Sequence, residues 1–134
     1  MKPARSIIWF AALAVLAGCA AGTRAPQAMN ENYTVPRNFQ TTYMRAQHQT
    51  LECLTNRSRY EVYATVDSAM QRATVLVRDA ATGNEVARTE VQSLDARHTQ
   101  VTHTAVGGDR WGAAAVDAMR RSIMSDTTVC ATYR

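Results

Sequence analysis

Lysine is almost absent from this sequence. Lys2 is the only lysine among 134 residues, so every other basic residue is an arginine. The arginines are scattered among acidic residues, which is typical of a mixed solvated surface. The formal net charge is +4, and it falls to about +2 when Lys2 and Arg5 are set aside. This charge is too small to indicate a nucleic-acid partner.

Reactive motifs are also missing. The chain has no G-x-S-x-G, H-E-x-x-H or C-x-x-C motif and no phosphate-binding glycine loop. Two of its three histidines, His98 and His103, are five residues apart, so on a strand they point to opposite faces. We expect both as polar residues on a half-exposed strand. The third, His48, is expected to be a solvated helix residue. We therefore predict a non-enzymatic protein without metal or other cofactor. An enzyme whose residues meet only in the fold is the lesser alternative.

A long hydrophobic run is lacking as well. The apolar run near the start, residues 7–17, reads I-I-W-F-A-A-L-A-V-L-A and carries no charge. As a helix it would span roughly 16 Å, about half the hydrocarbon core of a bilayer. Its length, and the basic residues Lys2 and Arg5 before it, are typical of a secretory signal peptide.

The signal ends in L-A-G-C, residues 16–19. This tetrapeptide resembles the lipobox of bacterial lipoproteins. The resemblance implies cleavage after Gly18 and acyl chains such as palmitate on Cys19, which would anchor the protein in a membrane. Two or three chains would make the anchor lasting. Because Ala20 rather than Asp follows the cysteine, the resemblance implies the periplasmic face of the outer membrane.

Two cysteines remain once Cys19 is assigned to lipid. Cys53 and Cys130 form an even pair in an exported protein, and the periplasm is oxidising, so we predict a disulfide between them. Free thiols or a metal pair are the alternatives, although two cysteines without neighbouring histidines make a poor zinc site.

The chain divides into three parts by composition. Residues 1–18 are the expected signal peptide, and residues 19–36 the lipidated N-terminus and a flexible tether. Residues 37–134 form a single domain. Pro36 is expected to open a helix, because proline suits the first helical turn. In that helix Phe39, Tyr43 and Ala46, with Thr50, Cys53 and Leu54, recur at helical spacing and predict a buried stripe.

Four stretches with strand character follow the first helix. They lie near residues 60–67, 72–79, 85–94 and 98–106, and Gly83-Asn84 predicts a hairpin turn between the second and third. A last helix, with Asp109 as its expected N-cap, would bury Trp111, Ala115, Met119, Ser122 and Ile123. We predict an α+β fold: a four-stranded antiparallel meander flanked by an N-terminal and a C-terminal helix, both packed on one sheet face.

These observations favour a lipid-anchored periplasmic interaction or assembly module with an envelope protein as partner. The alternative is a module that binds a small ligand or an envelope polymer. It would use the open sheet face or the arginines of T-N-R-S-R, Arg57 and Arg59, which are weak candidates. Tyr63, Leu76 and Leu94 are expected on the sheet face opposite the helices, where they would make it partly apolar. Scattered surface residues are the other interpretation of these three.

Overall fold

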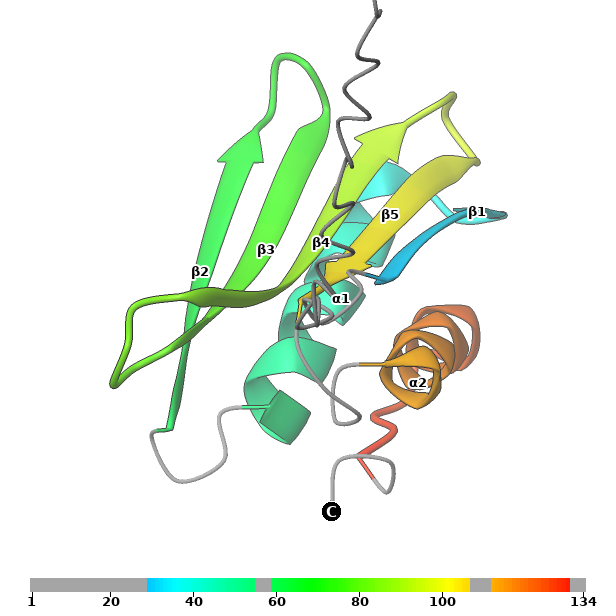
Figure 1. Cartoon of the computed structure of the whole chain (residues 1–134). Helices are drawn as coiled ribbons and strands as arrows, with labels where there is room; N and C mark the ends of the chain where they lie inside the picture. Colours follow the sequence, from blue (N-terminus) through cyan, green and yellow to red (C-terminus); the bar gives the residue numbers. More distant parts are fainter. Residues whose placement is uncertain (1–28, 55–58, 107–111, 131–134) are drawn as a thin grey trace, which may run out of the picture.

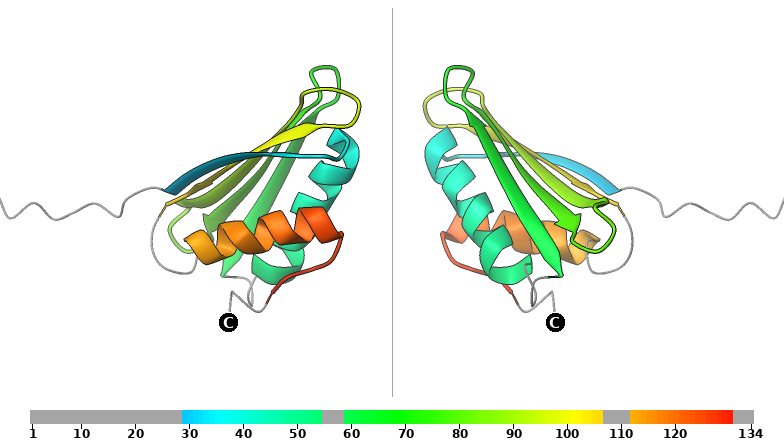
Figure 2. Two further views of the ribbon diagram at one scale, coloured as in Figure 1. Left: turned by 90° about the vertical axis from the view of Figure 1, so that its right-hand side faces the viewer. Right: turned by 90° about the vertical axis from the view of Figure 1, so that its left-hand side faces the viewer.

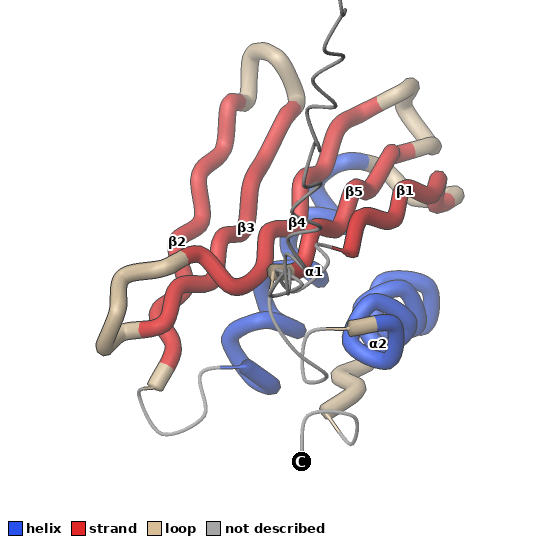
Figure 3. The backbone as a smooth tube through the Cα atoms, viewed as in Figure 1, coloured by secondary structure: helices blue, strands red, loops and turns tan. Residues whose placement is uncertain are grey.

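The computed structural model describes residues 29–54, 59–106 and 112–130. They form a five-stranded antiparallel sheet and two helices (Figures 1 and 3), which confirms the α+β class. The sheet has one strand more than the sequence predicted. The elements are β1 (Met29–Val35), α1 (Phe39–Leu54), β2 (Tyr60–Asp67), β3 (Arg72–Asp79), β4 (Glu85–Ser93), β5 (Thr99–Ala105) and α2 (Ala113–Ser125).

The last four strands form the expected meander. The strand order is β1-β5-β4-β3-β2, so each of β2 to β5 lies beside its sequence neighbour. The β3–β4 hairpin turns at Gly83, whose φ of 71° suits glycine. Asp79 secures this turn, because its side chain accepts hydrogen bonds from the main-chain N–H groups of Ala81 (2.9 Å) and Thr82 (3.1 Å).

The additional strand, β1, lies in the range that was expected to be tether. It pairs antiparallel with β5, from Met29 opposite Ala105 to Val35 opposite Thr99. Its inner side chains alternate with exposed ones, and Val35 at its end is buried. The sheet thus takes up residues 29–35 of the range we had assigned to a flexible linker.

Helix α1 begins three residues after Pro36, so the expectation that this proline opens the helix was wrong. Asn38 is the cap: its side-chain oxygen accepts a hydrogen bond from the N–H of Thr41 at 2.9 Å. An asparagine satisfies an otherwise free amide of the first turn in this way. Helix α2 begins at Ala113 with Gly112 in the N-cap position. The residues expected there, Asp109 and Trp111, lie outside the described part.

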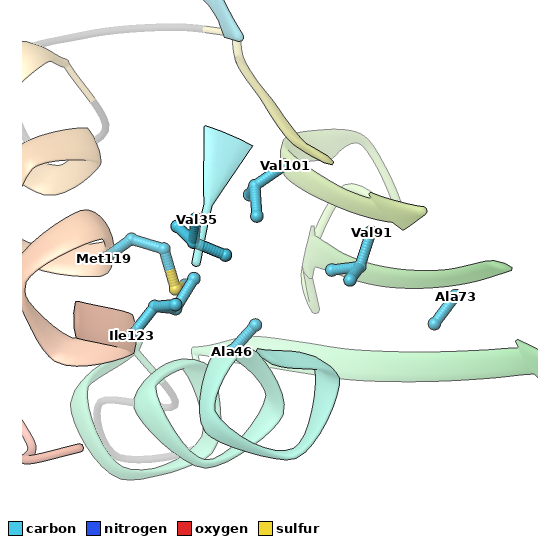
Figure 4. Close-up of a cluster of buried hydrophobic side chains, with 7 residues drawn as sticks. All are labelled: Val35, Ala46, Ala73, Val91, Val101, Met119 and Ile123. Carbon is cyan, nitrogen blue, oxygen red and sulfur yellow. The ribbon is translucent and has the colours of Figure 1, made fainter. Parts of the chain in front are cut away.

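Both helices lie on the same side of the sheet (Figure 2), as predicted. Helix α1 packs on β2, β3 and β4, and α2 packs on α1 and β1. One cluster of buried side chains between the layers comes from both helices and four strands (Figure 4): Val35, Ala46, Ala73, Val91, Val101, Met119 and Ile123. On β3, the predicted inner residues Ala73, Val75 and Val77 are all buried.

A disulfide joins Cys53 at the end of α1 to Cys130 after α2, as predicted. Beside it, the buried side chain of Gln49 holds the main chain of Val129 on both sides. Its amide nitrogen donates to the Val129 carbonyl at 2.8 Å, and its oxygen accepts from the Val129 N–H at 2.9 Å. The segment after α2 therefore lies against α1 and does not extend the sheet.

Candidate interaction surface

The outer face of the sheet, which neither α1 nor α2 covers, is the candidate functional surface. Strand pairing arranges its side chains in three rows that cross all five strands, listed here from β2 to β1. Most members carry a hydroxyl, an amide or a charge. The rows are Tyr63–Leu76–Arg88–Thr104–Asn30, Thr65–Thr74–Glu90–Thr102–Asn32 and Asp67–Arg72–Gln92–Gln100–Thr34.

Hydrogen bonds hold several of these side chains in place. Arg88 donates twice to the carboxylate of Glu85, at 2.8 and 2.7 Å. This pairing lowers the pKa of Glu85 and raises that of Arg88. At the other end of the sheet, Gln100 donates its amide N–H to the side-chain oxygen of Asn32 at 3.1 Å. The surface therefore presents fixed polar groups on a rigid β-sheet, which suits recognition of a polar partner.

Tyr63 is the aromatic residue of the outer rows, and it is 45% exposed. The guanidinium carbon of Arg78 lies 5.2 Å from its ring centroid. Its hydroxyl donates to Glu61 at 2.6 Å, and this hydrogen bond raises the pKa of Tyr63.

An open depression of about 220 Å³ lies over the middle of this face. Its polar lining residues come from β3, β4 and β5: Arg72, Thr74, Glu90, Gln92, Gln100 and Thr102. The volume is below the roughly 300–1,000 Å³ of typical small-ligand pockets. The depression is therefore better suited to a protruding side chain of a partner, or to part of a polymer, than to an enclosed ligand.

The apolar side chains predicted for the outer face divide between two locations. Tyr63 and Leu76 do lie side by side on it, opposite each other on β2 and β3. Leu94 does not, because β4 ends at Ser93 and Leu94 lies in the following turn. The outer face is consequently polar over most of its area, with a small apolar area at the β2 side.

The arginine candidates lie away from the depression. Arg59 precedes β2 and is exposed, with its guanidinium 5.3 Å from the ring centroid of Tyr60 and its Nε 3.8 Å from Asp79. Arg57 and the expected lipidation site, Cys19, lie outside the described residues.

His103 is buried, which corrects its expected place on a half-exposed strand. It lies on the helix-facing side of β5 and is 2% exposed. Its Nδ1 shares a hydrogen bond of 2.9 Å with the hydroxyl of Thr89, and its Nε2 has no hydrogen-bond partner among the described residues. Burial lowers its pKa to about 4, so it is neutral at pH 7.

Two charged groups lie near His103 on the same side of the sheet. Glu31 is directly opposite it on β1, and Arg120 of α2 makes an ion pair with Glu31. Arg120 also lies over the ring of Tyr33, 4.4 Å from its centroid. This inward cluster joins α2 to β1, and only the Thr89–His103 part of it is fully buried.

The remaining histidines are exposed and lie on different elements. His98 contacts Asp95 at 2.9 Å in the β4–β5 turn, and His48 lies on the outer side of α1. The pKa of Asp95 is lowered, chiefly by the N–H of Arg97. In the described ranges, no three histidine, cysteine or carboxylate side chains gather as a metal site requires. Neither helix of this part has the length and apolar character needed to cross a membrane.

The polar outer face was missed in the sequence because its residues are far apart in the chain. Glu90, Thr102 and Asn32 become neighbours only through strand pairing. The alternation of threonine and glutamine with valine along β4 and β5 is the signal that could have revealed it. The chain matches no protein-family model, and no curated protein is similar to it in sequence.

Proposed function

We propose that this protein is a lipid-anchored lipoprotein of the cell envelope whose single domain is a non-enzymatic interaction or assembly module. The lipobox-like L-A-G-C supports an anchor on Cys19, and Ala20 after it supports the periplasmic face of the outer membrane. The Cys53–Cys130 disulfide agrees with an oxidising compartment.

The main support for an interaction module is the outer face of the sheet, which neither helix covers. It offers a broad, rigid and polar surface without a deep cavity, which is suited to protein contact. We assign the contact to the middle row, where Thr74, Glu90 and Thr102 lie side by side. The partner is an envelope protein with hydrogen-bonding and basic groups that complement Glu90.

Site-specific photocrosslinking in cells tests this assignment. A photoreactive residue at Thr102 should give a discrete adduct with an envelope protein, and Glu90→Arg should abolish it. The same probe at Arg121, an exposed residue of α2 whose side chain is 57% accessible, is the matched control and should give none. Repeated failure at Thr102, or equal adducts at both positions, would reject the module.

The anchor is tested separately. Cys19→Ala should leave the precursor uncleaved and without acyl chains, as seen by its slower migration and by the absence of labelled palmitate. Normal processing of this variant would show that L-A-G-C is not a lipobox.

A second candidate function, binding of an envelope polymer, is favoured by the depression on the same face. Its arginine, carboxylate and amides could hydrogen-bond a glycan. Cosedimentation with purified cell-wall polymer distinguishes the two functions. If the double variant Gln92→Ala, Gln100→Ala no longer binds the polymer, polymer binding by this depression is favoured. If the double variant binds as well as wild type, this function is rejected.

A further inference from the structure

The open edge of the sheet at β2 has the properties of a pairing surface. β2 is the last strand of the sheet, and its eight residues pair with β3 without a bulge. It contains no proline and no lysine. Edge strands that avoid pairing use such residues, a bulge, or a charge on the inner face. The inner side chains of β2 are instead all apolar: Tyr60, Val62, Ala64 and Val66.

The direction of the free main-chain groups follows from one hydrogen bond. The N–H of Ala80 donates to the carbonyl of Arg59 at 2.9 Å, so these two residues are a hydrogen-bonded pair. Bonding alternates along an antiparallel ladder, so the odd-numbered residues of β2 bond to β3. Val62, Ala64 and Val66 therefore turn their N–H and C=O groups to the open edge. Val66 also remains 44% exposed.

We infer that β2 pairs antiparallel with β2 of a second copy of this chain, so that the two sheets become one ten-stranded sheet. The occupant is identified by charge complementarity. When Tyr63 faces Tyr63 of the second copy, Arg59 falls opposite Asp67 of that copy, twice by symmetry. Arg59 is 65% exposed in the single chain, so it can exchange its exposed contact with Asp79 for this one.

The neighbouring register centred on Ala64 is less favourable. A shift that centres the pairing on Ala64 places Glu61 opposite Asp67 of the second copy, where like charges repel. The Tyr63-centred register instead places Glu61 opposite Thr65. It also joins Val62 to Ala64 of the second copy in a hydrogen-bonded pair, so the free main-chain groups meet each other. A two-fold axis through Tyr63 gives a closed dimer, because each copy then uses the same β2 edge and neither β2 strand has an open edge left.

Cysteine crosslinking tests the geometry. At a non-hydrogen-bonded antiparallel pair the Cα atoms are about 4.5 Å apart, within the range of a disulfide. The full chain with Tyr63→Cys, expressed in the envelope, should therefore form a covalent dimer. Thr74→Cys, one strand further in, is the matched control. Its two copies would be three strand spacings apart across the sheet and four residues apart along it, roughly 20 Å in all, so it should stay monomeric.

Three variants test the register in the full chain, purified in mild detergent and measured by light scattering. Arg59→Asp or Asp67→Arg alone should weaken the dimer roughly tenfold, and the double variant should restore it. Ala64→Pro should abolish it while retaining β3 pairing, because proline removes only an outward N–H. Circular dichroism checks that each variant is folded.

Several results would overturn the inference: a wild-type chain that stays monomeric at its highest soluble concentration, equal crosslinking at residues 63 and 74, or a double variant no better than the single ones. Capture of a different protein through Tyr63→Cys would assign the edge to that partner instead. The dimer uses the edge of β2, whereas the envelope partner is assigned to Thr74, Glu90 and Thr102 on β3, β4 and β5. Loss of one interaction with retention of the other therefore tells the two proposals apart.

Discussion

The two edge strands of the sheet differ in what secures them. β1 carries Glu31 on its inner face, and α2 supplies Arg120 to pair with that carboxylate and to cover the ring of Tyr33. β2 has only apolar inner side chains. Its C-terminal half extends beyond the cover of α1, so Val66 is 44% exposed. An inward charge with a helical partner protects one edge from pairing, whereas the other edge is left able to pair.

The largest expected effect on this comparison comes from removing the disulfide. The disulfide holds the segment after α2 against α1, and α2 in turn packs on β1. Replacing Cys53 and Cys130 together by alanine should lower the free energy of unfolding by about 4 kcal/mol, because the bond closes a long loop in the unfolded chain. Equilibrium urea unfolding measures the loss. A change below about 1 kcal/mol would show that packing alone holds α2 in place.

The second test is acidification, which acts on His103 beneath the β1 side. Its pKa is near 4 in the folded protein and 6.5 in the unfolded chain, so the unfolded state takes up the proton first. Stability should be full above pH 6.5, fall as the pH drops towards 4, and level off below. Between pH 7 and 5 the loss should be about 2 kcal/mol.

His103→Gln is the control for this pH dependence. The variant should be less stable than wild type at pH 7 but should lose most of the slope between pH 7 and 5. Urea unfolding at a series of pH values measures both. An unchanged slope in the variant would assign the effect to other groups.

The smallest test compares one arginine at each edge. Arg120→Gln removes an ion pair and a cation–π contact at β1 and should cost about 1 kcal/mol. Arg59→Gln, beside β2, should change the stability of the single chain by less than about 0.5 kcal/mol, because its contact with Asp79 is exposed. Thermal unfolding under dilute conditions measures both. Equal losses would remove the distinction between the edges.

Periodicity predicted the parts of the fold whose pattern is local. The inner residues of β3, the hairpin at Gly83 and most of the α2 stripe follow from the identity of near neighbours. On α1 the pattern found Ala46 and Thr50 but missed the buried Thr42 and Gln49, because polar residues do not mark a core face. The disulfide followed from the two cysteines that remain when Cys19 is assigned to lipid. These features specify an α+β domain with both helices on one face, which the structure confirms.

β1 escaped prediction for a physical reason. Its inner positions are Met29, Glu31, Tyr33 and Val35, so a charged residue interrupts the apolar alternation. The charge is tolerated there because the Glu31 side chain is still 32% exposed and because Arg120, far along the chain, pairs with it. The burial of His103 was missed in the same way, since its partner Thr89 comes from another strand. The positions of β1 and His103 depend on residues far away in the chain, and a single sequence does not show which distant residues will be in contact.

The position of β1 in the sheet also bears on the order of folding. The meander from β2 to β5 joins neighbours in sequence, so it can form early and at low cost in chain entropy. β1 precedes these strands in the chain yet pairs with the last of them, β5, so its pairing closes the longest loop in the sheet. The segment next to the proposed lipid anchor is therefore expected to dock last. During export, β1 would therefore stay unpaired until the rest of the domain has folded.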